Sequence, residues 1–385
     1  MTRSSLVGYV HTMPPADKIS PAYKLISADG HFNEPGDLWT SRVAAKFADQ
    51  VPRIESFDEG DAWVMEGAPT SRPFGWGACA GKAPDQMGKW CRFEDLNPGS
   101  YDPKARVEEM TADGIDAEVL FPSGIWQWIS AAPSDDLHLE LVRAYNDFVS
   151  EFASHDPARL GGVAMLPSRG VESTVAELKR VLQMPGFVGL LLNCYPNGTL
   201  NIEPEDDAVW GLIQESGMPL TIHVMLSNRM PRPLVAQGLP GTVHFNDAPQ
   251  RILQFIFCGV LDRFPDLTIP MVETDCGWLP YFSEQADDNY LRHKDSSLRD
   301  QNLPMLPSEY MAKHFPATFI NDNYAIANRH RIGVDRMMWS NDYPHITSDW
   351  PYSWKSIKAS FADVPVDEKQ AILCGNAQRI FGFGR

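Results

Sequence analysis

Residues 24–31 read Lys-Leu-Ile-Ser-Ala-Asp-Gly-His, so an apolar run at 24–29 ends in an acid and is followed closely by an imidazole. Successive side chains of a strand point to opposite faces, which places Asp29 and His31 on the same side if this run is a strand. In a barrel of parallel strands, the catalytic groups lie where the strands end. This stretch therefore predicts a first strand whose end faces a site.

Seven more short apolar runs, rich in β-branched residues, follow along the chain at 116–121, 160–166, 187–193, 219–224, 267–273, 317–321 and 336–342. Their near-continuous apolar character indicates strands covered on both faces, as in a parallel sheet. Segments with helical periodicity lie between them, for example 135–154, 171–182, 206–215 and 248–264. Eight strands with intervening helices predict an α/β fold of the (β/α)8 TIM-barrel type, with a doubly wound open sheet as the alternative.

One long segment, residues 51–97, interrupts this alternation after the first strand; it is rich in Gly, Pro and Trp and has no sustained period. A structureless stretch of this length is unusual within a compact domain and is often functional. We therefore predict an inserted lid or dimer arm that contains a hairpin including 62–65. We expect residues 1–23 to form an N-terminal arm and the whole chain, 1–385, to form a single domain.

The composition limits the partners. The 385 residues are 43% hydrophobic and carry a formal net charge of -17, which argues against nucleic acid because an acidic surface repels phosphates. No apolar stretch approaches the roughly 20 residues of a membrane-spanning helix, and no signal-peptide pattern is present, so we expect a cytoplasmic protein without a membrane partner. The six cysteines are scattered singly, and we expect most to be buried and none to form disulfides.

Two further runs carry a metal-binding group at their ends. His223 follows Leu-Thr-Ile, and Asp342 follows Trp-Ser-Asn. With Asp29 and His31 they make two imidazoles and two carboxylates, which Zn²⁺ and Mn²⁺ both accept as ligands. Taken singly, each has a structural alternative: a cap or turn for either aspartate, and a buried core position for His223. Their shared placement at strand ends favours one catalytic metal site.

Several motifs carry a family resemblance: Asp29-Gly-His-Phe-Asn-Glu-Pro, Arg263-Phe-Pro-Asp-Leu, Gly277-Trp-Leu-Pro-Tyr and Arg336-Met-Met-Trp-Ser-Asn-Asp-Tyr-Pro-His. In order, and over residues 24–383, the chain resembles the amidohydrolase-related branch of the amidohydrolase superfamily, which contains aminocarboxymuconate-semialdehyde decarboxylase and γ-resorcylate decarboxylase. The resemblance implies a barrel that holds one divalent cation, with Asp29, His31, His223 and Asp342 as its ligands.

The sixth strand departs from the family pattern. Family decarboxylases have a histidine there, in a His-x-Gly context, whereas this chain has Glu273. Glu273 is a candidate acid or base, or a group that orients a ligand.

His345, just after the eighth strand, is a candidate to reach the substrate or the outer shell of the metal, with a surface loop histidine as the alternative. An arginine of the inserted segment could clamp a substrate carboxylate, the candidates being Arg53, Arg72 and Arg92.

The leading functional hypothesis is a non-oxidative decarboxylase of an aromatic or unsaturated carboxylic acid, with the metal on the substrate carboxylate and Asp342 or Glu273 handling the proton. The alternative is a hydrolase of a lactone, an amide or a carbon–carbon bond, with Asp342 as the base for metal-bound water. A non-enzymatic scaffold is a third reading, disfavoured because all four ligands are present. We expect Zn²⁺, or else Mn²⁺, a small-molecule substrate, and a homodimer or higher homo-oligomer.

Overall fold

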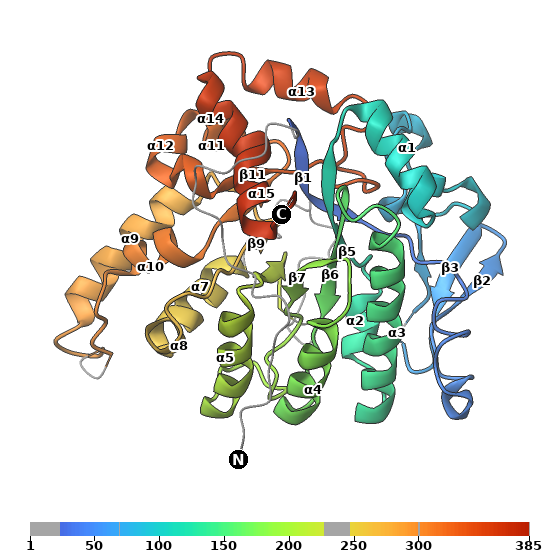
Figure 1. Ribbon diagram of the computed structural model, residues 1–385, viewed down its shortest axis with the longest axis horizontal. Helices are drawn as coiled ribbons and strands as arrows, with labels where there is room; N and C mark the ends of the chain where they lie inside the picture. The colour runs from blue at the N-terminus through green and yellow to red at the C-terminus, as the bar shows by residue number, and fades with distance from the viewer. Residues whose placement is uncertain (1–23, 69, 227–246, 299–300, 385) are drawn as a thin grey trace.

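The central feature is a sheet of eight parallel strands (Figure 1). The computed structural model describes residues 24–68, 70–226, 247–298 and 301–384. The strands follow one another around the sheet in chain order, each joined to the next along the sequence by a crossover: β1 (Ile26–His31), β5 (Ala117–Phe121), β6 (Leu160–Met165), β7 (Phe187–Leu191), β8 (Leu220–His223), β9 (Met271–Val272), β10 (Ala317–Phe319) and β11 (Met337–Trp339).

The sheet closes on itself between β11 and β1. The backbone N–H of Asp342 donates to the carbonyl of Asp29 at 3.1 Å, and the N–H of His31 donates to the carbonyl of Tyr343 at 2.6 Å. Gly30 and Tyr343 form a parallel bridge at the same place. The predicted (β/α)8 barrel is therefore confirmed, and the open doubly wound sheet is excluded.

The barrel interior is packed at one end and polar at the other. Its apolar cluster includes Ile26, Ala28, Val119 and Met338, together with side chains of the C-terminal helix α15 (Asn376–Phe381). A Cβ built on Gly161, at the start of β6, would lie 2.7 Å from the ring of Phe383. The C-terminal segment thus covers the N-terminal ends of the strands, which leaves the opposite mouth for the polar residues.

Most predicted helices are found close to their expected bounds. The segments 135–154, 171–182 and 206–215 form α3 (Asp135–Ala153), α4 (Val171–Val181) and α5 (Asp207–Ser216). The prediction of a single helix at 248–264 is wrong, because this segment forms two helices, α7 (Ala248–Phe257) and α8 (Val260–Arg263). Gly259 lies between them with φ of 74°, a left-handed conformation that ends a helix.

The remaining helices complete the outer layer and the loops at the barrel mouth. They are α1 (Pro103–Asp113), α2 (Trp126–Ser130), α9 (Leu279–His293), α10 (Pro307–His314), α11 (Asn323–Ala327), α12 (Arg329–Ile332), α13 (Ser353–Ser360) and α14 (Val366–Gln370). In the described part of the chain, no helix is both long enough and apolar enough to cross a bilayer.

The inserted segment is ordered around a small antiparallel sheet of β2 (Arg53–Phe57), β3 (Gly60–Val64) and β4 (Arg72–Pro73). The strands β2 and β3 lie at one side of the barrel beyond α2 and α3 (Figure 1). The predicted hairpin around 62–65 corresponds to β2–β3. Trp63 is buried and packs edge-on against Trp39, with ring centroids 5.3 Å apart, so the insertion joins the main core. Its role as a lid or dimer arm stays a prediction, and the N-terminal arm at 1–23 lies outside the described residues.

Candidate active site

Asp29 and His31 point into the barrel mouth because β1 does not keep a regular alternation. Ile26 and Ala28 pack in the barrel interior, and strict alternation would send the odd-numbered residues to the outer face. The pairing of β1 with β5 shifts register between Ser27 and Gly30. Beyond this shift, Gly30 faces Glu118 on the outer side of the barrel wall. Its neighbours Asp29 and His31 therefore face the barrel interior.

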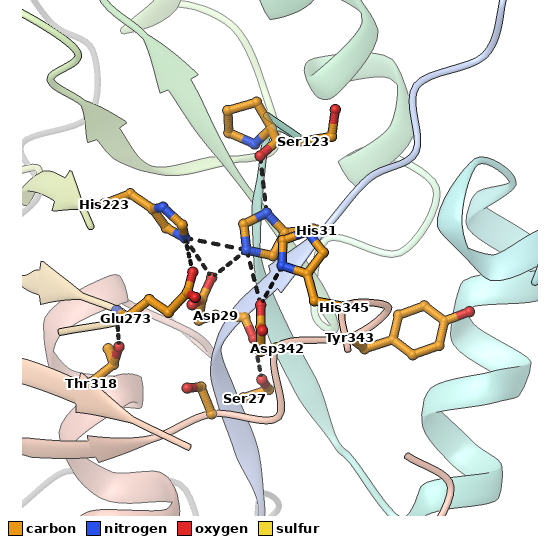
Figure 2. A network of polar contacts seen from close by, with 12 residues as sticks. Ser27, Asp29, His31, Ser123, His223, Glu273, Thr318, Asp342, Tyr343 and His345 are labelled. Carbon is orange, nitrogen blue, oxygen red and sulfur yellow. Dashed lines mark hydrogen bonds and ion pairs between the residues drawn. The ribbon is translucent and has the colours of Figure 1, made fainter. Parts of the chain in front are cut away.

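Six side chains converge at this mouth: Asp29, His31, His223, Glu273, Asp342 and His345 (Figure 2). The Nε2 atom of His31 lies 3.3 Å from Oδ1 of Asp29, 3.2 Å from Oδ1 of Asp342 and 3.2 Å from Nε2 of His223. The Nε2 atom of His223 lies 3.4 Å from Oδ1 of Asp29 and 3.3 Å from Oε2 of Glu273. All four predicted metal ligands are therefore brought together, with both further candidates beside them.

When its ring is neutral, His31 directs a lone pair into this group. Its Nδ1 lies 2.9 Å from the carbonyl oxygen of Pro122, and because a carbonyl only accepts, Nδ1 carries the hydrogen. In the neutral ring, Nε2 then presents a lone pair to Asp29, Asp342 and His223. Both carboxylate oxygens of Asp29 are buried and accept no hydrogen bond within the described structure. A positive charge between these buried acceptors would stabilise them.

The pKa shifts of the site also indicate that a positive charge is favourable there. Burial opposes ionisation of His31, yet Asp29 and Asp342 raise the pKa of His31 well above its ordinary value. The pKa of Glu273 is also raised well above its ordinary value, by burial and by the nearby Asp342 and Asp29. A divalent cation would satisfy all of these groups at once. The residue types and their spacing therefore fit the metal that the family resemblance implies.

The backbone is strained where the site is built. In the described residues, positive φ outside glycine occurs at Val224, Glu273, Asp275 and Asp342, with values between 52° and 57°. All four follow the ends of β8, β9 or β11. Such conformations cost about 1–3 kcal/mol each and persist where the surrounding structure enforces them, often at functional sites. At Glu273 the enforcing contact is the backbone N–H, which donates to Oγ1 of Thr318 at 2.8 Å.

Asp342 and His345 form a pair at the edge of the cluster. His345 Nδ1 lies 2.9 Å from Oδ1 of Asp342, and Oγ1 of Thr347 donates to Oδ2. The His345 ring stacks on His31 with centroids 3.9 Å apart. Burial raises the pKa of Asp342, but His345 and His31 outweigh it and hold that pKa well below its usual range. His345 is thus part of the site and not a surface loop residue.

The insertion reaches this pair through its backbone. The N–H groups of Cys79 and Ala80 both donate to the carbonyl of Pro344, at 3.0 and 3.1 Å. The amide of Asn33 donates to the carbonyl of Gly77 at 3.0 Å. These contacts fix the loop that carries His345, a role for the insertion that has no signature in the sequence.

A buried glutamate that the sequence reading passed over orients His31. Glu34 is fully buried and accepts hydrogen bonds from the N–H of Ser123 at 2.9 Å and from its hydroxyl at 2.6 Å. Ser123 follows Pro122, whose carbonyl binds Nδ1 of His31. Glu34 therefore holds the loop that sets the tautomer of a candidate ligand, a function such outer residues often serve. Its position in the Asp-Gly-His-Phe-Asn-Glu-Pro motif was the available signal.

The glycine between Asp29 and His31 is required by a buried ion pair. Arg106 Nε lies 2.7 Å from Oε2 of Glu118, and Arg106 also donates to the carbonyl of His31 at 2.9 Å. A Cβ built on Gly30 would stand 2.2 Å from Oε1 of Glu118 and 2.8 Å from Nη2 of Arg106. Both partners are buried, so they have little room to move aside.

We expect Gly30→Ala to lower the free energy of unfolding by about 1–3 kcal/mol, the usual cost of overpacking a filled interior. Equilibrium denaturation in urea measures this change. Gly88→Ala is the matched control, because a Cβ there meets no atom within 4 Å. Equal stability of the two variants would contradict the proposed role of the Glu118–Arg106 pair.

The other sequence candidates fall in different places. Of the three insertion arginines, Arg53 pairs with Glu55 and Arg92 with Asp61 inside the insertion itself. The guanidinium of Arg72 instead lies over Gly124, where an added Cβ would be 1.5 Å from Nη2, next to the Ser123 loop. A substrate clamp by Arg72 stays a prediction. The six cysteines are free, as expected, and Cys79, Cys194, Cys276 and Cys374 are buried.

Fold and site together define the class of (β/α)8 enzymes that gather histidine and carboxylate side chains at the C-terminal mouth of the barrel. The chain belongs to the amidohydrolase family, whose family model matches residues 28–383. The resemblance carried by the sequence motifs is thereby confirmed.

Several known proteins that are similar to this chain are decarboxylases. The chain is similar to a 2-amino-3-carboxymuconate-6-semialdehyde decarboxylase of Dictyostelium discoideum, with 24% identity over 298 residues that cover 76% of this chain and 79% of the relative. It is 25% identical to a gamma-resorcylate decarboxylase of Polaromonas sp. over 303 residues, covering 73% and 87%. A dihydroxybenzoic acid decarboxylase of Polaromonas sp., solved with bound manganese and the inhibitor 2-nitroresorcinol, shares the fold with a TM-score of 0.66 and 20% identity, covering 94% of this chain and 98% of that chain. These findings favour the predicted decarboxylase over the hydrolase alternative.

Proposed function

We propose that this enzyme is a metal-dependent, non-oxidative decarboxylase of an aromatic or unsaturated carboxylic acid. The observation that carries the proposal is the convergence of His31, His223 and Asp29 on one point, where both buried oxygens of Asp29 accept no hydrogen bond within the described residues. The names of the similar proteins supply the substrate class, since they act on resorcylate, dihydroxybenzoate or carboxymuconate semialdehyde.

A cation at this point would be held by Asp29, His31, His223 and a fourth ligand, which in the family pattern is the carboxylate of Asp342. When bound, it would bind the substrate carboxylate and a neighbouring oxygen and draw electron density from the ring as a Lewis acid. Zn²⁺ and Mn²⁺ both suit two imidazoles and two carboxylates. Manganese in the similar Polaromonas structure makes Mn²⁺ the first ion to test beside the Zn²⁺ expected from the sequence.

The residues of the chain handle the proton. Loss of carbon dioxide breaks the bond between the ring carbon and the carboxylate, and a proton must replace it on that carbon. Asp342 is buried beside the cluster, and its Oδ1 lies 2.9 Å from Nδ1 of His345. We assign the proton to this pair: His345 carries it at Nδ1, on the more exposed side of the site, and the ionised Asp342 beside it relays it to the ring carbon.

The test is a product assay in heavy water. Purified enzyme loaded with Mn²⁺ or Zn²⁺ is incubated with 2,6-dihydroxybenzoate and related hydroxybenzoates, and carbon dioxide is measured. We expect carbon dioxide release with one deuteron from D₂O at the carbon that lost the carboxylate, and no oxygen from H₂¹⁸O in the product. Incorporation of ¹⁸O without release of carbon dioxide would instead establish the hydrolase.

Three further points remain predictions of the same proposal. We propose a homodimer or higher homo-oligomer and a cytoplasmic enzyme, on the sequence grounds given above. We also propose that the insertion at 51–97 closes one side of the substrate site, because Gly77, Cys79 and Ala80 contact the segments that carry Asn33 and Pro344.

A further inference from the structure

The ends of β1 and β11 carry candidate ligands that must face one another across the place where the barrel closes. Asp29 and His31 lie at the end of β1, and Asp342 follows β11. We infer that Arg106, on α1, is a positioning residue of the metal centre, because it fixes these two ends relative to each other. This inference rests on the proposed function, since it requires that a cation binds between these side chains.

Few backbone contacts join the two ends. β1 pairs with β5 at four positions on its other side. Toward the β11 side, the mouth is closed by the bridge of Gly30 with Tyr343 and by the hydrogen bonds of Asp342 N–H and His31 N–H described above. These contacts all lie beyond Trp339, where β11 ends. The distance between the ligands of the two segments therefore depends on the side chains that connect them.

Arg106 contacts both segments at once. Its Nη1 donates to the carbonyl oxygen of His31 at 2.9 Å, on the β1 side. Its guanidinium carbon lies 4.4 Å from the centre of the Tyr343 ring, on the β11 side, which is within the range of a cation–π interaction. Tyr343 directly follows Asp342 in the chain. One buried cation thus contacts the backbone of one candidate ligand and the neighbour of another.

The guanidinium is itself held in one orientation. Its Nε donates to Oε2 of Glu118 at 2.7 Å, and Nη1 also donates to the carbonyl of Gly99 at 3.2 Å. The side chains of Arg106 and Glu118 are each only 1% exposed, so water does not compete for these contacts. Glu109, one turn further along α1, accepts the hydroxyl of Tyr343. The helix therefore contacts this ring both at its face and at its hydroxyl.

Arg106 matters for geometry more than for stability. A buried ion pair contributes little net stability, because the cost of removing both charges from water offsets their attraction. Asp342 has a φ of 52°, a conformation that persists only where the surrounding structure enforces it. Arg106 contributes to this enforcement through the next residue, Tyr343. A planar guanidinium can donate in two directions while it lies over a ring, which the ammonium group of lysine cannot do.

The test compares Mn²⁺ affinity, measured by electron paramagnetic resonance of the free ion, in wild type, Arg106→Lys and Arg159→Lys. We expect Arg106→Lys to bind Mn²⁺ at least about 10-fold more weakly, the lower range for loss of a group that orients a ligand. Arg159→Lys is the matched control. Arg159 also contacts α1, at Thr111, but it donates to the carbonyls of Ile115 and Asp116 at the opposite end of the barrel. Its Mn²⁺ affinity should stay within about threefold of wild type.

Two further measurements separate positioning from a purely structural role. Urea denaturation of the three proteins shows how much stability each lysine variant loses. At saturating Co²⁺, the visible absorption spectrum reports the geometry of the ligands. We expect an altered spectrum for Arg106→Lys and the wild-type spectrum for Arg159→Lys. A structural Arg106 would lower stability but leave the Mn²⁺ affinity and the Co²⁺ spectrum of the folded protein unchanged.

The outcomes also separate the inference from the proposed function. Wild-type Mn²⁺ affinity and Co²⁺ spectrum in Arg106→Lys would overturn the inference while the metal site stands. If wild type binds neither Mn²⁺ nor Zn²⁺, the proposed function and the inference fail together. Tyr343→Leu is the second variant if Arg106→Lys does not fold, because it removes the aromatic face and keeps the pair of Arg106 with Glu118. It should also weaken Mn²⁺ binding by about 10-fold, and unchanged binding would overturn the inference.

Discussion

Replacement of Asp342 by asparagine should leave a folded protein that has lost most of its activity. Asparagine has the shape of aspartate and is among the residues that best tolerate positive φ, so the strained backbone at this position is kept. The amide cannot exchange a proton with His345 or with the ring carbon. Because proton transfer by a positioned group contributes about 10²- to 10⁴-fold, we expect kcat to fall by about 10³-fold.

Circular dichroism and the metal content of the same sample show whether the loss is chemical. Asp335→Asn serves as the control, since it makes the same substitution at an exposed site just before β11. Its kcat should stay within about twofold of wild type, as for most surface substitutions. Full activity of Asp342→Asn would remove Asp342 from the mechanism.

Replacement of His223 by alanine should abolish both metal binding and turnover. His223 lies between Asp29 and Glu273, at 3.4 and 3.3 Å from their carboxylate oxygens, so its loss removes a ligand from the centre of the cluster. We expect metal affinity to fall by more than the roughly 100-fold upper range for an outer-shell partner. Activity should drop below detection at metal concentrations that saturate wild type. Elemental analysis after dialysis measures the loss directly.

The matched control for this variant is His155→Ala, which removes an exposed histidine that follows α3. That protein should retain about one equivalent of metal and wild-type turnover, as expected for a surface position. Retention of one equivalent of metal by His223→Ala, with the control unchanged, would show that the ion lies elsewhere in the barrel.

Much of the site could be read from local sequence because strand ends are marked by composition. The apolar runs before Asp29, His223 and Asp342 are continuous, and the polar residue that ends each one stands out. His345 was found for the same reason, by its proximity to Asp342. Glu34 and Arg106 were missed, since a single charged residue carries no signal of the buried partners, Ser123 and Glu118, that it meets only in the folded chain.

By itself, the sequence determined the order of strands and helices, the inserted segment and the identity of the candidate ligands, because hydrophobic periodicity and strand-end residues are local properties. Closure of the sheet into a barrel, between β11 and β1, was decided by the tertiary structure. Only the tertiary structure decided which way those ligands point. The register shift in β1 turns Asp29 and His31 inward, and it depends on pairing with β5, some 90 positions along the chain. The place of Glu273 beside His223, and of Asp342 beside His345, likewise depends on how β8, β9 and β11 close around β1. Contacts between distant segments arise from packing the whole barrel, which no local pattern records.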